Sequence, residues 1–298
     1  MDEYHTSVLL EETVDALSVK AGEQYVDATL GGGGHSFEIL KRGGIVLGMD
    51  ADQDSLDYVG EKIKNQKSKI KKNDLILAKG NFKDIDIIAK EHGFDEVAGV
   101  VFDLGVSSHQ LDRPERGFSF QSTGPLDMRM DRDLGVKAEG LINILTRREL
   151  YELFIKLGEE YNARAISEGI VRARRVKPIQ TTSELVEIVR QNVKGYKPGI
   201  NPATKVFQAL RIAVNDELNS LRESLPKALE LVGVNGRIAV ISFHSLEDRI
   251  IKQQFKEWEK DKKGKIVHKK PLIPSDEELT ANKRARSAKL RVFEKLTI

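Results

Sequence analysis

The sequence predicts an α/β protein whose core is a mostly parallel, Rossmann-like sheet, interrupted by a helical insertion. Two observations support this fold class. The first third of the chain alternates short apolar runs with amphipathic stretches, and these runs lack the polar alternation of a sheet with one wet face. After Ser108 the pattern is helical only, and a buried strand pattern returns at Gly236. The sheet is therefore expected to be discontinuous in sequence.

The most informative segment runs from Tyr25 to Asp50. It contains a short strand, four consecutive glycines at 31–34, a helix and a second strand that ends at Asp50. The glycines let backbone approach a ligand at the carboxyl edge of the sheet, and Asp50 stands where ribose hydroxyls are usually bound. The third glycine of a dinucleotide fingerprint is missing, and the chain has no P-loop motif. A ligand with ribose and adenine but no phosphate fits better, and S-adenosylmethionine is the obvious one. A nicotinamide-dependent dehydrogenase and a merely tight turn remain as alternatives.

The other elements follow from local patterns. A short helix is expected from Val8 to Leu17, and residues 111–135 are expected to form a long ordered loop. Two capping boxes, at 146–149 and 181–184, begin amphipathic helices. Asn201-Pro202 is expected to open one helix that continues to Leu221. Strands are expected at 25–28, 45–49, 75–78, 97–104, 236–244 and 289–296, with helices between the early strands near 37–41, 55–65 and 85–92.

Composition narrows the class of protein. The 298 residues are 40% hydrophobic and 32% charged, which is ordinary for a globular protein. The absence of cysteine excludes disulfides, a thiolate zinc site and a cysteine nucleophile. The six histidines are scattered without metal-ligand spacing, so no metal site is expected. No apolar window is long enough for a membrane span, and the acidic start lacks signal-peptide features. A cytoplasmic enzyme is the simplest interpretation.

Three further side chains are expected near the glycines, because each lies at or just after the carboxyl end of a predicted strand or in the loop that follows it. Asp103 ends the fourth strand, His35 opens the helix after the glycines, and His244 follows the fifth strand. Ligands of open α/β sheets bind outside the carboxyl ends of the strands. Each residue also has a structural alternative: Asp103 as a turn cap, His35 as an ordinary first-turn residue, and His244 as a histidine bonded to loop backbone.

The insertion carries clustered cations with a nearby aromatic residue. Such a cluster can bind phosphates and stack a base, although charged helix faces are more often simply solvated. The basic stretch from Lys252 to Lys270 is a weaker signal of the same kind. The candidate nucleic-acid-binding residues are Arg172, Arg174, Arg175, Lys177, Lys194, Tyr196 and Lys197.

Several segments together resemble the bacterial ribosomal RNA cytosine-N4 methyltransferases that act on small-subunit RNA. They run nearly from end to end of the chain, and several are peculiar to that family. The segments are H-T-S-V-L-L-E-E (5–12), D-A-T-L-G-G-G-G-H-S (27–36), F-D-L-G-V-S-S-H-Q-L-D (102–112), R-G-F-S-F (116–120), G-P-L-D-M-R-M-D (124–131), N-P-A-T-K-V-F-Q-A-L-R-I (201–212), I-S-F-H-S-L-E-D-R (241–249) and R-A-R-S-A-K-L-R (284–291).

The resemblance implies a class I S-adenosylmethionine-dependent methyltransferase fold with an inserted all-helical domain. It implies a discontinuous methyltransferase domain at 1–111 and 204–298, and a substrate-recognition insertion at 112–203. It also implies S-adenosylmethionine as methyl donor, S-adenosylhomocysteine as product, and a specific cytosine in the decoding region of 16S rRNA as target. The implied donor contacts are Gly33, Gly34, His35, Asp50, Phe82, Asp103 and Gln110. Phe82 and Gln110 rest on the resemblance alone, and His109 departs from the proline expected in many relatives.

Transfer of a methyl group to the cytosine amine needs an acceptor for its hydrogens, because the amine lone pair is delocalised into the ring. Amino-methyltransferases of DNA present an Asn/Asp-Pro-Pro-aromatic motif, and D-L-G-V stands in that place here. Asp103 is the candidate acceptor, with Asp127 and His244 as weaker candidates. A DNA amino-methyltransferase and a non-catalytic ribosome-assembly factor remain alternatives to the RNA enzyme.

Overall fold

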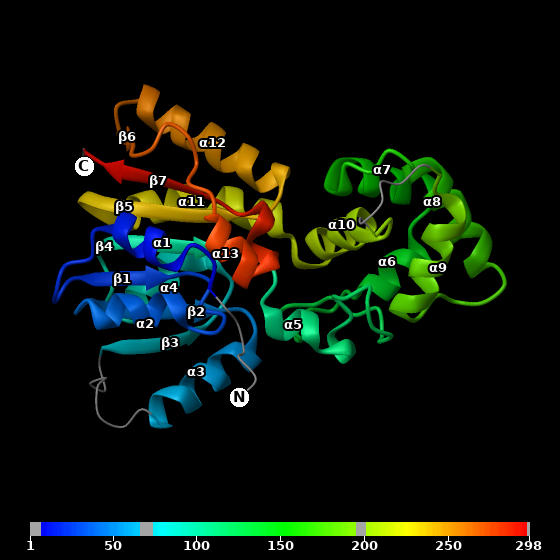
Figure 1. Cartoon of the computed structure of the whole chain (residues 1–298), viewed down its shortest axis with the longest axis horizontal. Helices are drawn as coiled ribbons and strands as arrows, with labels where there is room; N and C mark the ends of the chain where they lie inside the picture. Colours follow the sequence, from blue (N-terminus) through cyan, green and yellow to red (C-terminus); the bar gives the residue numbers. More distant parts are fainter. Residues whose placement is uncertain (1–6, 66–73, 195–200, 297–298) are drawn as a thin grey trace. The chain divides into compact units, whose positions relative to one another are not determined.

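The computed structural model describes residues 7–65, 74–194 and 201–296. The chain forms two compact units (Figure 1). The first, here called the sheet unit, comprises Met1–Ser107 and Leu218–Ile298, and the second, the helical unit, comprises Ser108–Glu217. The sheet unit is thus discontinuous in sequence, and the helical unit is one continuous stretch.

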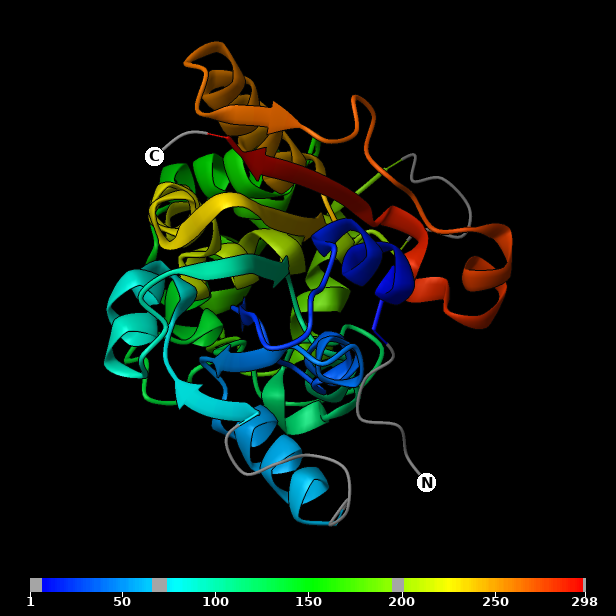
Figure 2. The same cartoon turned by 90° about the vertical axis from the view of Figure 1, so that its left-hand side faces the viewer.

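The sheet unit contains a seven-stranded sheet within the described residues, in the order β3-β2-β1-β4-β5-β7-β6 (Figure 2). Strands β1 to β5 pair in parallel, whereas β7 is antiparallel to both of its neighbours. This arrangement confirms the predicted Rossmann-like fold class. The strands are β1 (Gln24–Asp27), β2 (Ile45–Asp50), β3 (Leu75–Lys79), β4 (Val97–Asp103), β5 (Val232–Ser242), β6 (Gly264–Ile266) and β7 (Lys289–Lys295).

Both faces of the sheet are covered, which explains the absence of polar alternation in its strands. In β4, Val100 and Phe102 pack into one core cluster and Val101 into the other. Burial on both sides is the usual condition of parallel strands. The helices of this unit are α1 (Leu10–Leu17), α2 (Gly34–Lys41), α3 (Gln53–Asn65), α4 (Ile85–Glu91), α11 (Glu217–Leu231), α12 (Ser245–Lys260) and α13 (Asp276–Ala281), where α11 begins one residue before the unit boundary.

The helical unit confirms both predicted capping boxes. Thr146 begins α7 (Arg147–Gly158) and Thr181 begins α9 (Thr182–Asn192), each with its glutamate bonded back to the cap. Helices α7 and α10 approach so closely at Gly158 that a Cβ there would lie 2.6 Å from the Lys205 carbonyl oxygen. The other helices are α5 (Ser108–Asp112), α6 (Ala138–Ile144), α8 (Ala163–Arg174) and α10 (Thr204–Asn215).

The helix predicted from 201 to 221 is wrong as a single element. Helix α10 ends at Asn215, Asp216 adopts a left-handed backbone (φ 50°), and α11 begins at Glu217. The Asn215 side chain accepts from Met130 N–H at 2.7 Å and donates to the Met128 carbonyl at 2.8 Å. These bonds fix the end of α10 to the preceding loop. Residue contacts place α10 in the helical unit, which runs from Ser108 to Glu217. The insertion predicted from sequence, 112–203, ended just before α10.

The long loop before α6 is ordered by buried polar bonds, as predicted. Arg116 is 3% exposed and donates to the carbonyls of Arg129 and Met130 at 3.0 and 2.9 Å. Gly117 has a positive φ of 72°, and a Cβ there would overlap the Pro125 carbonyl oxygen. A buried guanidinium needs such partners, so the loop has one defined path. Among the described helices, none is both long and apolar enough to cross a membrane.

Candidate functional site

The glycine loop joins β1 to α2 at the carboxyl edge of the sheet. Gly31 and Gly33 have positive φ values of 49° and 77°, which glycine adopts without strain. A Cβ on Gly33 would lie 2.9 Å from Phe37 Cε2, and a Cβ on Gly34 would overlap Ser7 Oγ. Gly33 caps α2 without any side-chain hydrogen bond. The loop therefore presents bare backbone at a helix N-terminus, which suits close approach of a ligand.

Asp50 lies beside this loop, as the sequence predicted. Its carboxylate accepts hydrogen bonds from the backbone N–H groups of Gly31 and Asp52, each at 2.8 Å. Burial raises the pKa of Asp50 to about 6, against the lowering effect of these bonds. The group is thus mainly ionised at neutral pH, with lone pairs left to accept hydrogen bonds from ribose hydroxyls.

Asp103 and His35 also meet at this edge. His35 Nδ1 lies 3.8 Å from Asp103 Oδ2, which is an electrostatic contact rather than a hydrogen bond. His35 is 4% exposed, and its Nε2 has no hydrogen-bond partner among the described residues. The Asp103 backbone N–H donates to Thr29 Oγ1 at 2.6 Å, so the ends of β1 and β4 are linked.

Beneath these residues lies a carboxylate that the sequence analysis did not single out. Asp27 is 1% exposed and accepts hydrogen bonds from Ser36 Oγ at 2.7 Å and Thr29 N–H at 3.2 Å. Burial raises its pKa, partly offset by the charge of His35. Asp27 joins the strand end to the first turn of α2. The available signal was its place at the end of the first strand, directly before the glycine loop.

Phe82 occupies the turn that follows β3, at the same edge of the sheet. Its ring meets Phe102 edge-on, with centroids 5.8 Å apart and planes at 90°. Phe102 is fully buried directly before Asp103, whereas Phe82 is only partly buried. Phe82 thus provides apolar surface of the kind that an adenine ring packs against.

The residues of this edge fit S-adenosylmethionine. Bare glycine backbone, the Asp50 carboxylate, the apolar face of Phe82 and the buried unpartnered Nε2 of His35 lie on neighbouring loops. They supply polar partners for an amino-acid end and a ribose, with an apolar wall for a base. All the predicted donor contacts that belong to the sheet unit lie at this edge; they are Gly33, Gly34, His35, Asp50, Phe82 and Asp103.

Two further predicted donor or catalytic residues lie in the helical unit, and His244 follows β5 at the carboxyl edge of the sheet. Gln110 belongs to the helical unit and is 4% exposed. Asp127, also in the helical unit, bonds Arg129 Nε at 2.7 Å and Nη2 at 2.9 Å. Burial alone would raise the pKa of Asp127, but Arg129 and Lys137 hold it below its usual value. His244 begins α12, where its Nδ1 accepts from Glu247 N–H and its Nε2 lies 3.1 Å from Glu247 Oε1. Asp127 and His244 thus each stabilise local structure.

The predicted RNA-binding cations divide into bonded and unbonded groups. Arg174 donates to two backbone carbonyls at the end of α6, one of them at 2.6 Å. Arg172 bonds Asn192 at 3.1 Å, and Lys177 pairs with Glu184 at 2.7 Å. The bond from Lys177, together with backbone N–H bonds at the start of α9, lowers the pKa of Glu184 to about 2.

Other cations of this surface are exposed and have no side-chain partner within the described ranges. They are Arg175, at the end of α8, Arg190 on α9, and Lys194. Arg190 was not singled out from sequence, because a lone arginine on a helix gives no signal. Tyr196 and Lys197 lie outside the described residues.

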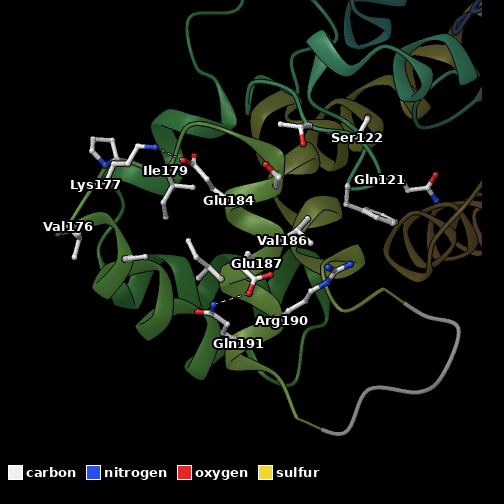
Figure 3. A pocket seen from close by; sticks show the side chains of 16 residues that line it. Gln121, Ser122, Val176, Lys177, Ile179, Glu184, Val186, Glu187, Arg190 and Gln191 are labelled. Atoms are coloured by element: carbon white, nitrogen blue, oxygen red, sulfur yellow. Dashed lines mark hydrogen bonds and ion pairs between the residues drawn. The ribbon is translucent and has the colours of Figure 1, made fainter.

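A groove of about 810 Å³ lies within the helical unit (Figure 3). The exposed residues Gln121, Val176 and Arg190 line it together with the partly buried Phe120. The Phe120 ring packs edge-on against Phe207, with centroids 5.7 Å apart. The groove therefore combines apolar surface with an arginine.

The sheet order and the glycine site define the class of protein, a class I Rossmann-like methyltransferase. The chain belongs to the MraW methylase family, whose model matches residues 2–296.

Relatives align over almost the whole chain. Ribosomal RNA small subunit methyltransferase H of Carboxydothermus hydrogenoformans is 46% identical, covering 100% of this chain and 99% of that protein. The proteins of the same name from Brevibacillus brevis and Clostridium botulinum are 44% and 43% identical, over 98% and 99% of this chain and 98% and 100% of theirs.

Among solved structures, a putative methyltransferase from Streptococcus mutans in complex with SAH is 12% identical, with a TM-score of 0.46 over 98% of this chain and 99% of that one. A putative rRNA-methylase from Clostridium thermocellum is 15% identical, with a TM-score of 0.44 over 98% of each chain.

Proposed function

We propose that this protein transfers a methyl group from S-adenosylmethionine to the N4 amine of a specific cytosine in the decoding region of 16S rRNA. The observation that carries the proposal is the cluster of Asp50, His35 and Asp103 around bare glycine backbone, in a chain that belongs to a methylase family. The family's rRNA methyltransferases at 43–46% identity support small-subunit RNA as the substrate. The proposed methyl transfer takes place in the cytoplasm, where ribosomes assemble.

The sheet unit holds the methyl donor. Gly33 and Gly34 offer backbone to it, Asp50 accepts from its ribose hydroxyls, and Phe82 packs on its adenine. His35 and Asp103 complete this side, and Gln110 is a further donor contact that rests on the family resemblance alone. The bound donor supplies an electrophilic methyl group on a sulfonium, and S-adenosylhomocysteine is the product.

Asp103 orients the target amine and accepts its proton. The cytosine amine is a weak nucleophile, so its lone pair must be aimed along the line of transfer. Positioning of this kind can supply up to about 7–11 kcal/mol. A carboxylate that accepts a hydrogen bond from the amine fixes that direction and receives the proton as the new C–N bond forms. Asp127 is less suited because its carboxylate already accepts hydrogen bonds from Arg129. His244 is less suited because its Nδ1 accepts from Glu247 N–H and its Nε2 lies against the Glu247 carboxylate, 3.1 Å from Oε1.

The helical unit binds the RNA. Single-stranded bases and phosphates are recognised by stacking surfaces and free cations, and the target base must leave its stack. Arg175, Arg190 and Lys194 offer such cations, with Phe120 nearby in the groove. Arg172, Arg174 and Lys177 keep their internal bonds, and at most their outer edges contact phosphate.

The test is transfer of labelled methyl from S-adenosylmethionine to small ribosomal subunits that lack the modification, followed by nucleoside analysis. We expect N4-methylcytidine from subunits, with little from naked RNA and none from DNA. Methylated DNA would favour the DNA amino-methyltransferase instead. Donor binding without transfer to any substrate would favour a non-catalytic assembly factor, and binding of a nicotinamide cofactor would favour a dehydrogenase.

A further inference from the structure

The N-terminal segment Ser7–Leu9, here called the strap, lies against the glycine loop. Ser7 sits so close to Gly34 that a Cβ at Gly34 would overlap both Ser7 Oγ and Ser7 Cβ. Leu9 is fully buried in a left-handed backbone conformation, with φ 51°. A buried, strained residue at this place indicates that the path of the strap is fixed by its surroundings.

One of those fixing contacts comes from the opposite end of the chain. The Leu9 backbone N–H donates to Glu278 Oε1 at 2.8 Å across a sequence separation of 269 residues. Glu278 lies on α13, whose first turn is capped by Ser275 through the Glu278 N–H at 3.2 Å. Figures 1 and 2 both show α13 beside α1, the helix that follows the strap.

The strap brings a hydroxyl to the start of α2. Within the described residues, no acceptor is recorded for the backbone N–H groups of Gly34, His35 and Ser36. The half-buried Ser7 hydroxyl has no recorded partner there either, and the Nε2 of the buried His35 is also unpartnered. Free N–H groups at a helix N-terminus favour an anionic group. The single anionic group of S-adenosylmethionine is the carboxylate of its methionine part.

We propose that the strap is part of the donor site. Ser7 donates its hydroxyl to the donor carboxylate at the first turn of α2, and Glu278 is a positioning residue that holds the strap in place. This inference rests on the proposed binding of the donor at the glycine loop, and it extends the donor site to two residues that the family motifs did not assign.

The test uses two donors that differ only in the carboxylate, namely S-adenosylmethionine and its decarboxylated form. Their dissociation constants are measured by calorimetry on the full-length protein. In Ser7→Ala, the affinity for S-adenosylmethionine should fall about tenfold, as expected for a lost hydrogen bond to a charged group. The affinity for the decarboxylated form should not change. An equal loss for both donors, or no loss for either, would overturn the role of Ser7.

Glu278 is tested by removal and by conservative replacement. Glu278→Ala should weaken S-adenosylmethionine binding selectively, by about threefold to tenfold, because the strap loses a partly buried hydrogen bond at Leu9 N–H. Glu278→Gln retains an oxygen that can accept from Leu9 N–H and should restore most of the affinity. Asp276→Ala, on the same helix, serves as the matched control and should bind both donors normally. Failure of glutamine to rescue, or loss in the control, would contradict the positioning role.

The contact between Ser7 and Gly34 is tested by a suppressor. Gly34→Ala should abolish donor binding because its Cβ needs the space of Ser7, and Ser7→Gly in the same chain should restore binding of the decarboxylated donor. No restoration would overturn the contact. If the wild-type protein binds neither donor, the proposed function fails as a whole, whereas normal wild-type binding with unaltered variants refutes the strap alone.

Discussion

The carboxyl edge of the sheet unit and the basic surface of the helical unit differ in how their functional groups are held. At the sheet edge, Asp27, Asp50 and Asp103 are joined by hydrogen bonds to neighbouring loops. On the helical unit, Arg175 and Arg190 are exposed side chains with no recorded partner in the described part of the chain. A small ligand that must be held in one geometry needs the first arrangement, whereas a flexible polyanion needs only the second.

The comparison also shows that position decides the role of an arginine. Arg174 and Arg175 are neighbours in sequence, yet Arg174 caps the end of α6 and Arg175 is exposed. Adjacent residues on a helix point about 100° apart, so one can face the protein while the next faces water. A cluster of cations in the sequence therefore mixes structural and binding residues.

The largest expected effect concerns the sheet edge. Asp103→Asn keeps the shape of the side chain but removes its capacity to accept a proton. Under donor saturation, single-turnover methyl transfer should fall by about 10²-fold or more. The exposed Asp95→Asn is the control and should react normally. Full turnover of Asp103→Asn with unchanged donor affinity would remove Asp103 from the mechanism.

The second prediction separates the two neighbouring arginines by stability. Arg174→Ala should lower the free energy of unfolding by about 2 kcal/mol, because two carbonyls at the end of α6 lose a charged donor. Arg175→Ala should stay within about 0.5 kcal/mol of wild type, as is usual for exposed side chains. Chemical denaturation monitored by circular dichroism measures both. Equal losses would contradict the distinction.

The third prediction uses the raised pKa of Asp50. The folded protein has a pKa of about 6 at this carboxyl, above its usual value of 3.8, so Asp50 opposes folding when ionised and this cost is relieved as the pH falls through 6. Donor binding has the opposite dependence, because ribose hydroxyls need the ionised acceptor. Donor affinity should therefore fall by up to about tenfold per pH unit below 6. Calorimetry between pH 5 and pH 8 measures it, and Asp50→Asn should bind weakly with a flat profile.

The smallest expected effect concerns the RNA surface. Arg175→Glu combined with Arg190→Glu should weaken binding of small-subunit RNA by about fivefold and lower the slope of log affinity against log salt by about 1 to 2. Donor affinity should not change, because the donor site keeps its own bonds. Lys20→Glu with Lys90→Glu makes the same change of charge on exposed residues of the sheet unit, outside the basic stretch 252–270. If that control loses as much RNA affinity, the effect reflects net charge and not this surface.

The sequence was most informative where local pattern decides structure. The glycine loop, Asp50 and the two capping boxes depend on residues within a few positions of one another, and the structure confirms their placement. The three-residue β6 was missed because it has no pattern of its own and, in the described part of the chain, pairs with β7 alone. The contact of Leu9 with Glu278 was equally out of reach, because no local signal relates residues 269 positions apart.

The break after Asn215 shows why the remaining elements could not be predicted. The apolar spacing of this region continues without interruption, and it correctly indicates helix on both sides. The break is caused by hydrogen bonds from Asn215 to a loop more than eighty residues earlier. Tertiary contacts of this kind override local helix propensity.

The discontinuity of the sheet unit has a consequence for biosynthesis. The central strand β4 pairs with β5, and the two are separated in sequence by the whole helical unit. During translation, residues 108–217 emerge as one continuous stretch with mainly local helical contacts, which form quickly. The sheet cannot close until β5 and then β7 have left the ribosome. We therefore expect the helical unit of the nascent chain to fold while β1 to β4 still lack β5 and β7. The donor site should then form only after roughly the last eighty residues have been synthesised.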